Sequence, residues 1–199
     1  MEYSTTVNPT KEQLQSVLAG LSFMTLNTLG WTTIGEIALH GRDYWLIGVV
    51  FAGILISFLT FYVKFQKAAK RLPAQQTAAT EDQKKSKRFI YIFIAEGAGI
   101  LILKNVLVNI GRDDWFLPGV AAIVGLHFFP LAKVFNRKFD YYMGIFVCLV
   151  AITGFVLLSK GYTTAVTTPV VCTGCAIATS LYGTMMVLKG NKILRESSL

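Results

Sequence analysis

Six long apolar runs follow one another along the chain, separated by short polar breaks. A helix needs about 20 predominantly apolar residues to cross the hydrocarbon of a bilayer. The pattern therefore predicts an all-α integral membrane protein, a single domain over residues 1–199 with six transmembrane helices packed in one bundle. The expected spans lie near residues 13–40, 44–65, 88–110, 115–135, 141–159 and 163–189.

The first run is the least apolar of the six. It carries Asn27, Glu36 and many Ser, Thr and Gly residues, a composition that also fits an amphipathic helix lying on a membrane surface. We expect it to span the bilayer, because only then do the polar breaks alternate between strongly basic and weakly basic along the chain.

Basic residues gather on one side of this topology. Of the 19 Lys and Arg residues, 15 fall before the first span, in the connections 66–87 and 136–140 with their flanks, or near the C-terminus. Cytoplasmic segments carry the excess of Lys and Arg in multi-span proteins. We therefore expect an inner-membrane protein with both termini cytoplasmic, and a cytoplasmic linker over 66–87. The basic linker serves as a topology anchor and spacer in one interpretation, and binds anionic lipid head groups in another.

A short motif, G-R-D-x-W, occurs twice, 70 residues apart. Each copy precedes an even-numbered span on the same side of the membrane, which predicts parallel hairpin repeats with a degenerate third hairpin over 141–189. Each position has a packing explanation: glycine for a left-handed turn, aspartate for a helix cap and tryptophan for the interface. A ligand or ion site outside the membrane is the alternative. The repeated residues are Gly41, Arg42, Asp43, Trp45, Gly111, Arg112, Asp113 and Trp115.

Charged side chains inside the spans are the main functional candidates. A charge at the centre of a membrane helix costs about 2.5–3.5 kcal/mol on insertion scales, so such residues face partners or water. At about 1.5 Å per residue, Glu96 and His127 lie at similar depths in consecutive spans and are expected to pair. Glu36 and Lys104 share a depth nearer the opposite surface, with Asn105 close by, and form a second expected pair. Both pairs fit either a proton or ion path or simple cross-links between helices.

Two further features of the spans invite a functional interpretation. Pro130 predicts a kink or hinge three residues after His127. Cys172 and Cys175 form a C-x-x-C pair, but small residues surround them, which favours close helix packing over redox chemistry. No metal site or cofactor is expected, since no second metal-spaced pair accompanies them.

Other classes of function lack their sequence signals. The basic clusters carry no interleaved aromatic residues, so nucleic acid is not an expected partner despite a net charge of +8. Nucleotide-binding and nucleophile-elbow motifs are absent, which disfavours an enzyme. A membrane enzyme acting on lipid or quinone is the least supported class, because the polar residues near Asp140 and Arg137 are too generic for a catalytic cluster. The layout of six spans with hairpin repeats resembles that of the HdeD-like bacterial membrane proteins, in architecture alone.

These observations leave two expectations for function. The first is a small proton- or ion-linked transporter or channel, acting as a homo-oligomer, with a polar path marked by Glu96, His127, Lys104 and Glu36. The alternative is a non-catalytic structural, stress-response or regulatory membrane protein whose buried charges only fix helix packing.

Overall fold

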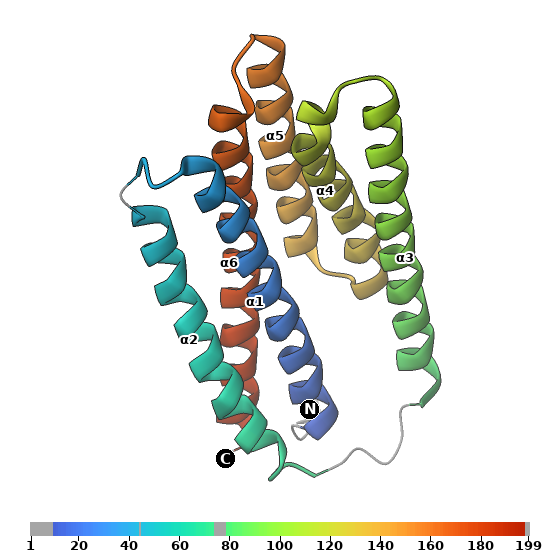
Figure 1. Ribbon diagram of the computed structural model, residues 1–199. Helices are drawn as coiled ribbons and strands as arrows, with labels where there is room; N and C mark the ends of the chain where they lie inside the picture. The colour runs from blue at the N-terminus through green and yellow to red at the C-terminus, as the bar shows by residue number, and fades with distance from the viewer. Residues whose placement is uncertain (1–9, 44, 74–78, 198–199) are drawn as a thin grey trace.

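Six long helices form a bundle, as the computed structural model shows (Figure 1). The structure describes residues 10–43, 45–73 and 79–197, and within them all regular structure is helical. A single 3₁₀ turn, η1 (Asp113–Trp115), precedes the fourth long helix. The helices are α1 (Lys11–Leu39), α2 (Leu46–Ala69), α3 (Ala79–Asn109), α4 (Phe116–Phe135), α5 (Lys138–Ser159) and α6 (Thr164–Glu196).

Each helix contains a stretch long and apolar enough to span a membrane, so the expected six-span, all-helical architecture is confirmed. Large apolar side chains cover the outside of the bundle, which suits lipid and not water as the surrounding solvent. On α2 and α3 these exposed side chains include Leu46, Val49, Ile56, Ile94, Leu101 and Ile102.

α6 is the central helix of the bundle. It contacts α1, α2, α4 and α5, and most of its span is buried. Glycines on α6 let the neighbouring helices approach closely: a Cβ added at Gly183 or Gly190 would lie within 2.5 Å of the ring of Phe58 or Phe65 on α2. Such small-residue contacts are typical of helix packing in membranes, where lipid competes with every larger apolar contact.

The helix pairs with the largest contacts are α1 with α6 and α4 with α5. Neither is one of the hairpins that the repeated motif predicts, although α1–α2, α3–α4 and α5–α6 do touch. α3 lies at the edge of the bundle, where it packs mainly against α4 (Figure 1). The arrangement as three parallel hairpin repeats stays a prediction.

The basic segments are distributed unevenly along the bundle. The start of α1, the end of α2, the start of α3 and the end of α6 lie towards one end, and the ends of α1, α3 and α5 lie towards the other (Figure 1). A backbone hydrogen bond of 3.1 Å from Lys11 to the carbonyl of Pro73 ties the start of α1 to the chain after α2. Most of the basic segments therefore lie towards one end of the molecule, whereas the turn between α4 and α5 lies nearer its middle (Figure 1).

Helices extend into the expected linker 66–87. α2 continues to Ala69 and α3 already begins at Ala79, while residues 74–78 lie outside the described part of the chain. Ala, Glu, Gln and Lys are strong helix formers, so a segment rich in them continues a helix beyond the hydrocarbon. Hydropathy alone marks where a span leaves the lipid, not where the helix ends.

Candidate functional site

Glu96 on α3 and His127 on α4 lie side by side. Nδ1 of the imidazole is 3.4 Å from Oε2 of the carboxylate, and the two side chains are only 10% and 13% exposed. This is the neighbour relation expected from their depths in consecutive spans. α3 and α4 bring them together because the short turn between the helices makes them antiparallel neighbours.

The pair sits in an aromatic environment, and its two facing atoms are not hydrogen-bonded to each other. His127 stacks on Phe128 at 4.6 Å between ring centroids, and Phe93 lies on its other flank at 6.1 Å. Neither Nδ1 of His127 nor Oε2 of Glu96 has a hydrogen-bond partner within the described residues, although both atoms are buried. Buried polar atoms are nearly always hydrogen-bonded, so this pair is one of the places among the described residues where bonding capacity is left over, as it is at Glu36, Arg137 and Asp140.

α3 has few contacts besides those with α4. Its ring contacts are Phe93 with Phe23 on α1, at 4.9 Å, and Phe89 with Phe135 near the end of α4, at 6.0 Å. Almost all of its span is exposed on the outside of the bundle. The Glu96–His127 contact therefore lies in the interface with α4, the one extensive packing partner of α3 among the described residues.

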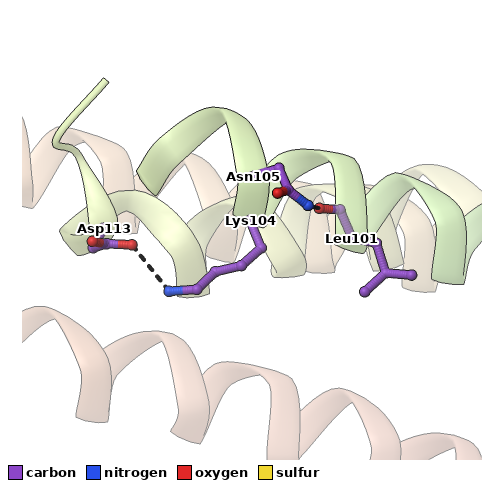
Figure 2. A network of polar contacts seen from close by, with 4 residues as sticks. All are labelled: Leu101, Lys104, Asn105 and Asp113. Carbon is purple, nitrogen blue, oxygen red and sulfur yellow. Dashed lines mark hydrogen bonds and ion pairs between the residues drawn. The ribbon is translucent and has the colours of Figure 1, made fainter. Parts of the chain in front are cut away.

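Lys104 and Asn105 do not join this pair. The Lys104 ammonium forms an ion pair of 3.0 Å with Asp113, and the Asn105 amide donates to the carbonyl of Leu101 on its own helix (Figure 2). Both Lys104 and Asp113 are at least half exposed. These residues lie at the end of α3 that meets η1, away from Glu96.

The expected Glu36–Lys104 contact does not form. α1 and α3 are not extensive packing partners, so equal depth does not bring their side chains together. Glu36 instead accepts a hydrogen bond from the backbone N–H of Gly48, in the first turn of α2. The residues that sequence analysis grouped into one polar path therefore occupy three separate places: the α3–α4 interface, the η1 end of α3 and the α1–α2 turn.

The two copies of the G-R-D-x-W motif adopt different local structures. Gly41 and Gly111 both have the left-handed backbone that a chain reversal needs, with φ of +72° and +67°. Asp43 accepts hydrogen bonds from the amides of Trp45 and Ile47 and so caps α2. In the second copy Asp113 makes no such bond, because its carboxylate is turned to Lys104.

The remaining motif residues are at the surface or beside it. Arg112 pairs with Asp114 at 3.4 Å and lies 4.2 Å from the ring of Trp115. Trp45 is 59% exposed and has a left-handed backbone, and the described contacts assign no partner to Arg42. Within the residues that the structure describes, neither turn gathers the ligands that an external ion site would need.

A buried cluster whose central contact sequence analysis missed lies where α4 joins α5, against α6. Asp140, in the first turn of α5, is fully buried and accepts a 2.8 Å hydrogen bond from the hydroxyl of Tyr182 on α6. Arg137, one turn earlier, forms an ion pair with the other oxygen of Asp140 at 3.3 Å. The partner hydroxyl lies 42 residues away in sequence, so no local pattern indicates this contact.

A second missed contact joins the two most closely packed helices. The hydroxyls of Thr28 on α1 and Thr179 on α6 share a buried hydrogen bond of 2.7 Å. Thr32 donates to the carbonyl of Thr28, and Thr179 also contacts the carbonyls of Cys175 and Ala176. Threonines are so common in membrane helices that their spacing alone does not reveal such a pair.

The cysteines and the helix proline add no chemistry to the site. Cys172 and Cys175 are buried free thiols, and the described residues contain no group of three His, Cys, Asp or Glu side chains that could hold a metal ion. α4 continues through Pro130 as one helix, so the proposed hinge stays a prediction.

Neither a protein-family model, nor a curated protein, nor a solved structure matches the chain.

Proposed function

We propose that this chain is a small proton-linked transporter or channel of the inner membrane, in which Glu96 and His127 form the proton-binding site. One observation carries the proposal: a carboxylate and an imidazole lie 3.4 Å apart between two membrane-spanning helices, and the facing atoms have no hydrogen bond among the described residues. Intramembrane pairs of this kind are typical of proton relays.

The chemistry of the pair suits proton exchange. Imidazole is the side chain that gains and loses a proton near neutral pH, and an adjacent carboxylate offers that proton a second acceptor. A proton that leaves Nδ1 of His127 reaches Oε2 of Glu96 after a small approach of the two groups, because 3.4 Å is only slightly longer than a hydrogen bond. Each transfer changes the attraction between α3 and α4.

The position of α3 supports coupling between protonation and movement. Among the described helices α3 packs extensively against α4 alone, so few other contacts oppose a movement of α3 relative to the rest of the bundle. A change in protonation that strengthens or weakens the Glu96–His127 contact shifts the equilibrium between positions of α3. A proton or a ligand can shift such an equilibrium only if it interacts differently with the two positions.

Orientation and assembly form part of the same proposal. Most of the basic segments lie towards one end of the bundle, together with both termini of the helical bundle, which supports cytoplasmic termini and contacts with anionic lipid head groups there. A bundle of this size is small for a complete transporter, which favours a homo-oligomer.

The test is proton flux in proteoliposomes that contain a trapped pH-sensitive dye. With an imposed pH gradient and a potassium diffusion potential, the wild-type chain is expected to collapse the gradient faster than protein-free vesicles do. Glu96→Gln and His127→Asn each remove one member of the pair and are expected to reduce the rate to the protein-free level. Lys104→Gln is the matched control, because Lys104 lies on the same helix in an exposed ion pair, and it should retain the flux.

Two results would contradict the proposal. One is a wild-type rate equal to that of protein-free vesicles, and the other is flux that survives unchanged in both pair variants.

A structural or regulatory role is the second candidate, and a specific observation favours it. Glu36 and Asp140, the other two buried carboxylates among the described residues, both serve helix ends and helix contacts. If Glu96 does the same, its loss destabilises the fold without any effect on flux. The stability of Glu96→Gln therefore separates the two candidates.

A further inference from the structure

A pocket of about 310 Å³ lies between α1 and α2, near the turn that joins them. It is separate from the Glu96–His127 pair, which belongs to α3 and α4. Its walls are mostly apolar, with two hydroxyls and one acidic side chain among them. The lining residues that matter here are Leu29, Thr32, Glu36, Trp45, Ala52 and Leu55.

Glu36 is the acidic group of this pocket, and its charge is incompletely compensated. The side chain is only 7% exposed. One oxygen accepts from the Gly48 amide, while Oε2 has no hydrogen-bond partner and the carboxylate forms no ion pair within the described residues. The amide belongs to the first turn of α2, where the helix dipole stabilises a negative charge. A buried anion with one free oxygen is complementary to a cation.

Trp45 contributes the aromatic surface of the pocket. Its backbone is left-handed, with φ of +62°, which is unusual for a residue other than glycine and costs about 1–2 kcal/mol. This conformation folds the indole back over the turn, where the ring lies 3.4 Å from the Cβ position of Gly41. An indole face is the strongest aromatic partner for a cation.

The chemistry of the walls and the volume of the pocket limit the kind of ligand that it can hold. An anion would be repelled by Glu36, and a metal ion would find a single carboxylate and apolar walls. At about 30 Å³ for each water-sized group, the pocket holds on the order of ten non-hydrogen atoms. A small ammonium ion with an apolar body matches the carboxylate, the indole and the apolar walls together.

We propose that the pocket between α1 and α2 binds a small lipophilic ammonium cation, with the Glu36 carboxylate as its counter-ion and the Trp45 ring against its face. The cation is either a free amine or the ammonium of a lipid head group, since the pocket lies between two helices of the bundle surface. The proposal is independent of proton transfer at Glu96 and His127.

The experiment measures equilibrium binding by calorimetry, with the full chain in maltoside micelles. The probe is benzyltrimethylammonium, and the neutral comparison is neopentylbenzene, which has the same shape without the charge. The wild-type chain is expected to bind the cation saturably, with an affinity about thirtyfold higher than that for the neutral compound. This ratio is what one desolvated charge pair contributes to the affinity. Glu36→Gln should remove this preference. Glu96→Gln, a carboxylate on a different helix, should keep it.

A second variant tests binding in the pocket even if Glu36→Gln does not fold. Ala52 lines the pocket with an exposed side chain, so Ala52→Phe fills the pocket without touching the carboxylate. It should abolish binding of both probes while the melting temperature stays near that of the wild type. Absence of saturable cation binding in the wild type, or wild-type binding in the variants that fold, would overturn the proposal.

A third experiment distinguishes a free amine from a lipid head group as the bound cation. Phosphatidylethanolamine is added to the micelles, and phosphatidylglycerol serves as the control lipid. Displacement of the probe by phosphatidylethanolamine alone supports a lipid head group as the ligand, and its failure to displace a bound probe supports a free amine.

Discussion

Asp140 and Glu96 are both buried carboxylates among membrane-spanning helices, yet their surroundings differ in one decisive respect. Asp140 has a hydroxyl donor at 2.8 Å and a guanidinium at 3.3 Å, in the well-packed region around α6. Glu96 has a single imidazole at 3.4 Å, at the edge of the bundle where α3 meets only α4 extensively. Oδ2 of Asp140 and Oε2 of Glu96 both lack a hydrogen bond among the described residues, so the difference lies in the partner group. A carboxylate beside a permanently charged guanidinium stabilises a contact, whereas one beside a titratable imidazole can exchange a proton.

The largest expected effect is on the stability of the α6 region. Asp140→Ala leaves Arg137 and the hydroxyl of Tyr182 without their partner, and removal of one member of a buried polar pair costs about 3 kcal/mol. Thermal unfolding in detergent should show a melting temperature well below that of the wild type. Asp114→Ala is the control, because its ion pair with Arg112 is exposed and contributes at most about 1 kcal/mol. Equal melting temperatures for the two variants would show that the buried Asp140 cluster stabilises the fold no more than the exposed ion pair does.

A pair of glycine substitutions compares the packing of the two regions. Gly183→Ala places a methyl group 2.5 Å from the Phe58 ring and should destabilise the bundle by about 1–3 kcal/mol. Gly97→Ala, next to Glu96 on α3, meets nothing within 4 Å and should be neutral or slightly stabilising, because alanine favours a helix. Equilibrium unfolding of the two variants measures both effects. A loss at Gly97 as large as that at Gly183 would mean that another chain covers this part of α3.

The six-span architecture was predictable because apolar runs of sufficient length leave few alternatives. The positions of the helix ends were less predictable, because the segment after Ala79 is polar but rich in helix formers. Which helices lie side by side was not predictable either. The extensive α1–α6 contact joins the first and last helices of the chain, and the approach of α2 to α6 depends on glycines and rings far apart in sequence, such as Gly183 and Phe58.

The candidate site was likewise predictable only in part. Glu96 and His127 were predictable as neighbours because a short turn fixes the register of α3 and α4. Glu36 was assigned to Lys104 on depth alone, and that assignment was wrong because α1 and α3 do not pack together at this level. Asp140 and Tyr182 went unnoticed because their contact depends on the register of α5 against α6.

The smallest expected effect on stability is at Glu96. Glu96→Gln keeps the size of the side chain and removes a charge that is poorly compensated, so the free energy of unfolding should change by less than about 0.5 kcal/mol or increase. Chemical unfolding in mixed micelles gives this number. A loss comparable to that of Asp140→Ala would assign Glu96 to helix packing and favour the structural role.

The most direct test of the central claim is a pH titration of the reconstituted chain, followed by infrared difference spectroscopy of the carboxyl groups. A carboxylic C=O band should appear as the pH falls, be absent in Glu96→Gln and change in His127→Asn, while Asp140→Asn leaves it in place if that variant folds. A titrating band that is identical in the wild type and in Glu96→Gln would show that Glu96 takes up no proton, and would contradict the account.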